Sequence, residues 1–428
     1  MKESNQIKLL LFMKKIFIAL SFLTCVLLST NSFAQETQPL DTVANALERI
    51  QSDLGILKRL KITGYIQAQA VLSDSSSFGS GANTYDKNFQ LRRGRIKFAY
   101  QATPWSQYVM QFDVTEGGFK TKDIYAKFTD PYTKALTLTA GVFNRAFGYE
   151  IEYSSSNRES PERSRFTTTL FPNERELGAM LTIQAPKTSR WNFIKMDLAL
   201  LSGNSIAAET DKFKDFLGRI NFNKSFMDEV LKLSGGASYY WGGNANPTAA
   251  NYAVGEWAGV KGFYKYDVAL SSRAIREISG IDFQATLASN IGLSTLRGEY
   301  VWGREPGTST SSTGPTAAYT TDVYNRQVSG FYAYFVQNIG QSRHSIVVKY
   351  DIYDPNTKLA GTDINATNGC SAADVKYNTV GLGYTLRLDD NTKIVVYYDK
   401  VMNETTGVKG YTQDRKDNLL TLRLQYKF

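Results

Sequence analysis

Residues 420–428 read LTLRLQYKF and end the chain with an unbroken alternation of apolar and polar side chains. Successive side chains of a β-strand point to opposite faces, so this stretch predicts a strand with one apolar and one polar face. The same alternation returns at residues 93–100, 107–114 and 345–352. A soluble sandwich would bury such apolar faces in a core, whereas a membrane barrel would turn them toward lipid.

Segment length and loop length distinguish these two architectures. The alternating segments are roughly ten residues long, which suits a tilted strand crossing a bilayer. Short and long connections tend to alternate, as in barrels with short periplasmic turns and longer outer loops. The sequence therefore predicts an all-β fold: a transmembrane antiparallel β-barrel of about 16 strands with both termini in the periplasm. The expected strands are 61–72, 89–101, 106–115, 122–130, 134–143, 175–185, 190–201, 214–224, 229–241, 277–288, 293–304, 327–337, 343–353, 375–388, 392–402 and 415–428.

Residues 256–267 also contain β-forming aromatic side chains. A further wall strand at this place would break the alternation of short and long loops and leave the C-terminus on the outer side. We therefore expect this segment within the fifth outer loop, either as irregular chain or as a local hairpin.

The N-terminal part of the chain lacks this alternation. A basic pair, an apolar run and small residues at a cleavage junction are typical of a signal peptide over residues 1–34, with Met13 as an alternative start. Residues 35–60 contain an apolar repeat of three and four residues, which predicts a short periplasmic helix. That helix is packed on its own chain, part of an oligomerising coiled coil, or in contact with the cell wall. The barrel domain then covers residues 61–428.

Composition excludes several classes of functional site. The 428-residue chain has one His and two Cys, which rules out multi-histidine metal sites and four-cysteine zinc cages, and we expect no cofactor. The single histidine, His344, falls on the outward face of an expected strand, so no serine–histidine pair is indicated and we expect no enzymatic activity. Although the net charge is +9, the basic residues alternate into a barrel and do not indicate a nucleic-acid partner.

Six short motifs follow one another in order along the first half of the expected barrel. They are Gly64-Tyr65-Ile66-Gln67, Leu91-Arg92-Arg93-Gly94-Arg95, Lys122-Asp123-Ile124-Tyr125, the stretch GVFNRAFG at 141–148, Glu162-Arg163-Ser164 and Arg175-Glu176-Leu177-Gly178. This ordered set resembles the phosphate-selective porins O and P of Gram-negative bacteria, in a Bacteroidetes-type form. The resemblance implies a trimeric porin of sixteen strands whose third loop folds into a basic lumen that guides phosphate. It also implies that a helical N-terminal extension assists trimerisation.

The phase of each expected strand assigns the charges that face the lumen. Inward bases outnumber inward acids by eleven to six, and a cleft lined by one sign of charge concentrates counter-ions. The bases are Arg93, Arg95, Lys97, Lys127, Lys195, Arg219, Lys232, Arg297, Lys349, Arg387 and Arg423, and the acids are Asp113, Asp123, Asp197, Asp282, Glu299 and Asp351. Residues 327–337 and 392–402 are apolar on both faces and receive no assignment.

Loop 144–174 carries both arginines and glutamates. These charges would form either an anion site or a lattice of salt bridges that holds the loop folded. On the wall, Asp113 and Asp123 are expected to compensate the closely spaced bases of residues 93–97. We expect the anion-binding residues of wall and loop to be Arg93, Arg95, Lys97, Lys127, Arg145, Arg219 and Arg297.

These observations predict a passive outer-membrane porin with a water-filled, basic lumen that favours small anions such as phosphate. The expected partners are the permeating anions, outer-membrane lipid and further copies of the chain in a homotrimer. Two alternatives stay open. One is a general or saccharide-permeable porin without phosphate selectivity, since Tyr65, Tyr125 and Tyr240 face inward. The other is a structural or enzymatic outer-membrane barrel.

Overall fold

The computed structural model describes residue 55 and residues 58–74 and 87–428. The chain divides into two compact units, residues 1–57 and 58–428, and the β-structure of the described residues belongs to the second unit. The expected signal peptide and nearly all of the expected helical extension lie outside the described residues. Within the described ranges, no helix has the length and apolar character needed to cross a membrane.

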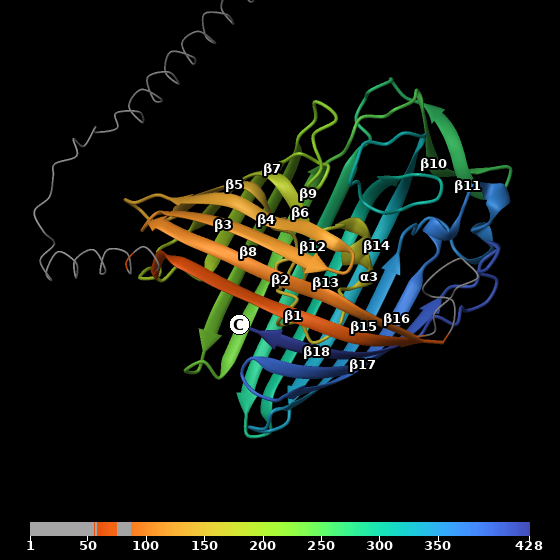
Figure 1. Ribbon diagram of the computed structural model, residues 1–428. Helices are drawn as coiled ribbons and strands as arrows, with labels where there is room; N and C mark the ends of the chain where they lie inside the picture. The colour runs from red at the N-terminus through yellow and green to blue at the C-terminus, as the bar shows by residue number, and fades with distance from the viewer. Residues whose placement is uncertain (1–54, 56–57, 75–86) are drawn as a thin grey trace, which may run out of the picture. The chain divides into compact units, whose positions relative to one another are not determined.

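Sixteen strands form the wall of the second unit, and each corresponds to one of the sixteen expected strands (Figure 1). Their ends differ from the expected ends by at most four residues, as at the start of β14. The wall strands are β1 (Leu60–Ser73), β2 (Lys87–Thr103), β3 (Ser106–Thr115), β4 (Gly118–Thr129), β5 (Leu136–Asn144), β6 (Arg175–Gln184), β7 (Ile194–Leu201), β8 (Asp215–Phe226), β9 (Leu231–Gly242), β12 (Arg276–Ser289), β13 (Gly292–Gly307), β14 (Val323–Asn338), β15 (His344–Asp354), β16 (Tyr377–Arg387), β17 (Thr392–Asn403) and β18 (Leu419–Lys427).

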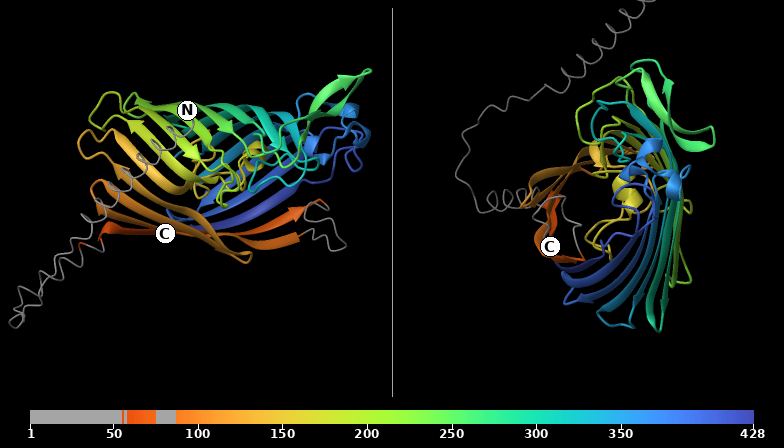
Figure 2. Two further views of the ribbon diagram at one scale, coloured as in Figure 1. Left: turned by 90° about the horizontal axis from the view of Figure 1, so that it is seen from above. Right: turned by 90° about the vertical axis from the view of Figure 1, so that its right-hand side faces the viewer.

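The wall closes on itself. Strand β1 pairs antiparallel with β2 on one side and with β18 on the other, and β9 pairs antiparallel with β12. Every wall strand therefore has two hydrogen-bonded neighbours, and no open sheet edge is left in the wall. The right-hand view of Figure 2 shows the strands as a ring. The expected all-β, closed antiparallel barrel of sixteen strands is confirmed.

A hairpin outside the wall occupies the fifth long connection, as one of the two expected forms of this segment. It consists of β10 (Ala250–Trp257) and β11 (Val260–Asp267), which pair antiparallel along their whole length. Strand β10 also pairs in parallel with the first residues of β14, from Val323 to Asn325. The hairpin thus extends the sheet beyond the wall without adding a crossing, and the alternation of loops is preserved.

The two ends of the barrel differ in their connections. At the short-turn end the strands are joined by turns such as 104–105 and 290–291, and the long-loop end carries connections such as 145–174 and 355–376. The connection between β3 and β4 departs from the expected length, because β4 begins at Gly118 rather than four residues later. Gly118 has φ +99°, and this left-handed conformation allows a tight turn directly after β3.

The outward face of the wall is apolar, as the C-terminal stretch predicts. On β18, Leu422, Leu424 and Tyr426 point outward and are each almost half exposed, whereas Arg423 and Gln425 point inward and are 3% exposed. An apolar exterior around a polar interior is the arrangement of a barrel that meets lipid on its outer side.

The interior is filled on one side by the connection between β5 and β6. This segment, residues 145–174, is called the inner loop; it contains the short helix α3 (Arg165–Leu170), drawn inside the ring in Figure 2. Its apolar side chains share one hydrophobic cluster with the inward-facing Tyr332 of β14 and Tyr397 of β17, and the Phe166 ring stacks on the ring of Tyr332. These two strands are apolar on both faces because one face meets the exterior and the other meets the inner loop.

Gly330 on β14 makes this packing possible. A Cβ atom at this position would lie 2.5 Å from Cβ of Phe166 on α3. The Gly330→Val substitution is therefore expected to push α3 away from the wall and destabilise the barrel by about 1–3 kcal/mol. Thermal unfolding followed by the heat-dependent shift of the barrel in SDS gels measures this loss. Ala333→Val, on the outward face of the same strand, is the matched control and should leave the transition unchanged.

Candidate pore

The inner loop enters the barrel through a sharp bend at Gly148, which has φ +62°. A side chain there would collide with the carboxylate of Glu299 on β13, because a Cβ atom would lie 1.8 Å from Oε1. The Glu299 carboxylate accepts hydrogen bonds from the backbone amides of Tyr149 and Glu150, both at 3.1 Å, and from the hydroxyl of Tyr332. The Glu299 carboxylate of the wall thus accepts the hydrogen bonds of backbone amides where the inner loop enters the barrel.

The middle of the inner loop reaches the opposite side of the barrel. The hydroxyls of Tyr65 and Ser155 are 2.5 Å apart, and Gln67 donates to the backbone oxygen of Ser155 at 3.0 Å. On the neighbouring strands, Gln425 and Lys393 both donate to the backbone oxygen of Ser156 at 2.9 Å. The loop is therefore fixed at both sides of the lumen.

Glu162 of the inner loop pairs with three arginines of the wall. Its carboxylate accepts from Arg92 at 2.7 Å, from Arg93 at 3.1 Å and from Arg423 at 3.1 Å. Burial alone would raise the pKa of Glu162, but the three nearby guanidinium groups outweigh it and hold that pKa well below its usual value. Glu162 therefore stays ionised and ties the loop to β2 and β18.

The remaining acids of the loop are also engaged. Glu159 pairs with Arg297 at 2.6 Å, and Glu174 pairs with both Arg163 and Arg175. Although burial opposes ionisation, these two arginines lower the pKa of Glu174 to about 2. The charges of the inner loop were expected to form either an anion site or a lattice of salt bridges. These contacts form the lattice of salt bridges.

Five of the seven expected anion-binding residues are ion-paired and almost fully buried. Arg145 is bonded to Glu176 at 2.6 Å and is 1% exposed, and Arg219 is bonded to Asp282 at 2.6 Å. Arg95 pairs with Asp113 at 2.7 Å, as expected, whereas Asp123 pairs with Arg175 and not with the bases of residues 93–97. Arg93 and Arg297 pair with acids of the inner loop. An anion must compete with these carboxylates.

Lys97 and Lys127, the other two expected residues, have no carboxylate within ion-pair distance among the described residues. Lys97 is half-buried on β2, and Lys127 is exposed on β4. The charged groups that act on Lys127 include Lys97, Lys195 and Asp197, so these side chains share one region of the lumen. Both lysines therefore offer the lumen a positive charge that is not ion-paired among the described residues.

Strand β4 carries two further lysines that strict alternation assigns to the outside. A register shift opposite Gln111 places both Lys122 and Asp123 on the inward face, as in a β-bulge. Phe119 before the bulge and Ile124 after it both point outward, although four residues lie between them and strict alternation would require an odd number. This spacing of two outward apolar residues is the signal in the sequence that indicates the bulge. Lys120 and Lys122, with Lys97 and Lys127, form what we call the lysine row.

A basic cavity of about 290 Å³ lies between the inner loop and strands β2–β4. Six cationic side chains line it against two acidic ones, and the acids are those already paired with Arg95, Arg163 and Arg175. Its charged lining residues are Arg92, Arg93, Arg95, Lys120, Lys122, Arg163, Asp113 and Glu174.

Two of the expected inward tyrosines do not face open water, and the single histidine lies outside the lumen. Tyr240 is fully buried under the inner loop, and the Tyr65 hydroxyl is bonded to Ser155, so these rings form no open aromatic track. His344 has its Nδ1 2.5 Å from the Tyr384 hydroxyl, on the outer side of the wall as expected. The described residues contain no cluster of three or more metal-ligating side chains.

No protein-family model matches this chain, and no curated protein sequence matches it. Solved structures do. The outer membrane channel DcaP of Acinetobacter baumannii is 12% identical, with a TM-score of 0.52 over 86% of this chain and 97% of its own. OprB of Pseudomonas putida is 10% identical, with a TM-score of 0.52 over 89% of this chain and 97% of its own. OmpT of Vibrio cholerae, in its trimer form, is 9% identical, with a TM-score of 0.51 over 86% and 99%.

The fold is that of a sixteen-stranded porin. The expected likeness to outer-membrane barrels is confirmed at the level of the fold, because OmpT and DcaP are outer-membrane proteins with the same type of barrel. The finer resemblance to phosphate-selective porins stays a prediction, since none of these neighbours is described as phosphate-selective.

Proposed function

We propose that this protein is a passive outer-membrane channel whose aqueous lumen favours small anions. The observation that carries the proposal is the lysine row, whose four ammonium groups face the interior without a carboxylate in ion-pair distance among the described residues. Five of the six expected inward acids, by contrast, are ion-paired. The charge left to act on a permeating ion is therefore positive.

Membrane placement follows from the outer surface of the barrel. The wall is apolar outside, and aromatic side chains such as Tyr239, Trp241 and Trp302 are exposed near its long-loop end, where an interfacial girdle is expected. The proposed orientation puts the short-turn end, with both barrel termini, in the periplasm. Assembly as a homotrimer is part of the proposal, supported by the trimer form of the OmpT structure.

Phosphate is the proposed preferred anion. The basic cavity joins guanidinium forks, which suit oxyanions, to Lys120 and Lys122, which have no carboxylate within ion-pair distance among the described residues. A dianion entering from the long-loop end would meet this cavity first and the lower lysines Lys97 and Lys127 afterwards. This order supports a capture step followed by passage along the lysine row.

Single-channel recording of the purified protein in a planar bilayer tests these proposals in turn. Under a KCl gradient the reversal potential is expected to show chloride preference, and added phosphate is expected to reduce the chloride current at millimolar concentration or below. Chloride preference without phosphate block would leave a general anion porin. Preference for potassium would contradict the anion proposal, and absence of conductance would favour a structural barrel closed by the inner loop.

A further inference from the structure

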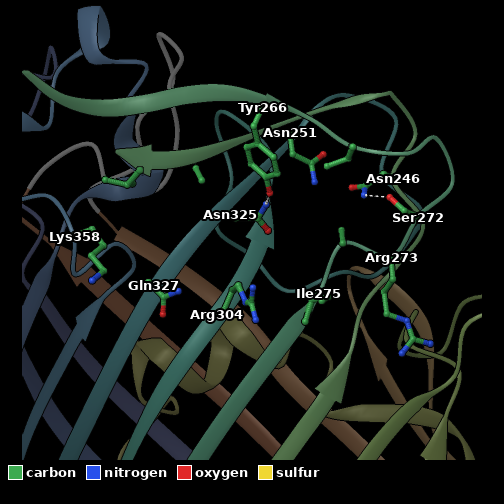
Figure 3. Close-up of a pocket in the computed structure, with 14 residues that line it drawn as sticks. Asn246, Asn251, Tyr266, Ser272, Arg273, Ile275, Arg304, Asn325, Gln327 and Lys358 are labelled. Atoms are coloured by element: carbon green, nitrogen blue, oxygen red, sulfur yellow. Dashed lines mark hydrogen bonds between the residues drawn. The ribbon is translucent and has the colours of Figure 1, made fainter. Parts of the chain in front are cut away.

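A second polar pocket lies outside the pore, at the long-loop end of the barrel. It has a volume of about 290 Å³ and lies between the β10–β11 hairpin and the ends of β13 and β14 (Figure 3). Its lining is rich in side-chain amides and cations: Asn246, Asn251, Asn325, Gln327, Arg273, Arg304 and Lys358. None of these residues contributes to the basic cavity of the pore.

The pocket opens on the outer side of the wall. Arg304 follows Trp302 by two residues along β13, and Trp302 points outward with 40% exposure. Arg304 is bonded at 3.3 Å to Glu277, whose carboxylate also accepts from the outward-facing Tyr239. The pocket therefore lies just beyond the outward aromatic side chains, at the level where lipid headgroups meet a membrane barrel.

Two buried amide oxygens in the pocket have no hydrogen-bond donor. Asn246 and Asn251 are each 2% exposed, and the Oδ1 atom of each is unpartnered, although the Asn246 amide nitrogen donates to Ser272 at 3.0 Å. A buried acceptor that no group of the chain satisfies must be met by water or by a ligand that brings donors, such as hydroxyl groups. The Nε atoms of Arg273 and Arg304 are also without an acceptor.

We propose that this pocket binds a phosphorylated sugar. Hydroxyls of the sugar would donate to Asn246 and Asn251, and the phosphate would accept from Arg304 and Lys358, since guanidinium and ammonium groups recognise phosphate oxygens. The ligand is either a soluble sugar phosphate or the headgroup of a glycolipid in the outer leaflet, and the second source rests on the proposed membrane placement. The pocket is independent of the anion path through the lumen.

Native mass spectrometry of the full chain in detergent tests this proposal with two probes, lipid A and glucosamine 1-phosphate. Arg304→Gln and Lys358→Gln are each expected to weaken binding about tenfold, because each removes a charge-assisted hydrogen bond to the phosphate. Lys261→Gln removes the same charge from the exposed tip of the hairpin and should bind like the wild type. Arg304→Lys should retain part of the affinity.

The outcomes distinguish the two sources of the ligand and decide whether the proposal holds. Binding of lipid A alone identifies a glycolipid headgroup, and binding of glucosamine 1-phosphate with the same sensitivity to the variants identifies a soluble sugar phosphate. Equal weakening by Lys261→Gln, or no binding of either probe to the wild type, would overturn the proposal. Conductance and anion preference should be unchanged in Arg304→Gln, so failure here is distinguishable from failure of the proposed channel function.

Discussion

Replacing Lys97, Lys122 and Lys127 together with glutamine is expected to remove most of the anion preference of the channel. Two unit charges 4 Å apart interact by about 1 kcal/mol in water and by about 4 kcal/mol near a protein surface. Loss of three unneutralised charges should therefore change the anion-to-cation permeability ratio by at least about tenfold, since about 1.4 kcal/mol corresponds to that factor. The reversal potential under a KCl gradient measures the change and should move toward the cation side.

Salt dependence and a matched variant separate this effect from a general change in charge. Lys400 is exposed on the outward face of β17, and Lys400→Gln should leave the reversal potential unchanged. The effect of the triple variant should shrink between 0.1 M and 1 M KCl, because the Debye length falls from about 10 Å to about 3 Å. An unaltered reversal potential in the triple variant would show that the lysine row does not set selectivity.

The fold of this chain is largely predictable because the exterior and interior of the barrel impose period two on most of its strands. Residues 420–428 show this: outward Leu422 and Leu424 are exposed, and inward Arg423 is buried, as alternation requires. Loop lengths then set the number of crossings and keep the β10–β11 hairpin out of the wall. Both signals are local in sequence and need no knowledge of distant contacts.

The candidate pore is less predictable because its electrostatics depend on contacts between distant segments. Arg423 meets Glu162, which precedes it by 261 residues, and no local pattern indicates that pairing. Strand phase assigns Arg93, Arg219 and Arg297 to the inward face, where they are buried, but each is paired with a carboxylate. The bulge at Lys122 also breaks strict alternation. Alternation therefore predicts the inward direction of Lys97 and Lys127 in the lysine row, but not that of Lys120 and Lys122.

Glu162→Gln is expected to loosen the inner loop and raise the single-channel conductance. The neutral amide cannot compensate Arg92, Arg93 and Arg423, which would then repel one another where the loop meets the wall. The expected loss of docking free energy is about 1–2 kcal/mol, reduced from the value for a buried pair because the Glu162 side chain is 43% exposed. Glu256→Gln, on the exposed β10–β11 hairpin, is the control and should conduct like the wild type.

The pH dependence of conductance is expected to identify Glu162 as the anchor. Burial opposes its ionisation, but Arg93, Arg92 and Arg423 hold the pKa of Glu162 well below its ordinary value of 4.5. A carboxyl whose pKa is lowered in the docked loop stabilises docking at pH values above its ordinary pKa. This stabilisation is lost as the pH falls through the lowered pKa. Wild-type conductance should thus be constant from about pH 7 to about pH 5 and should rise toward the Glu162→Gln value only in stronger acid. If Glu162→Gln still responds to acid as the wild type does, then another carboxyl holds the loop.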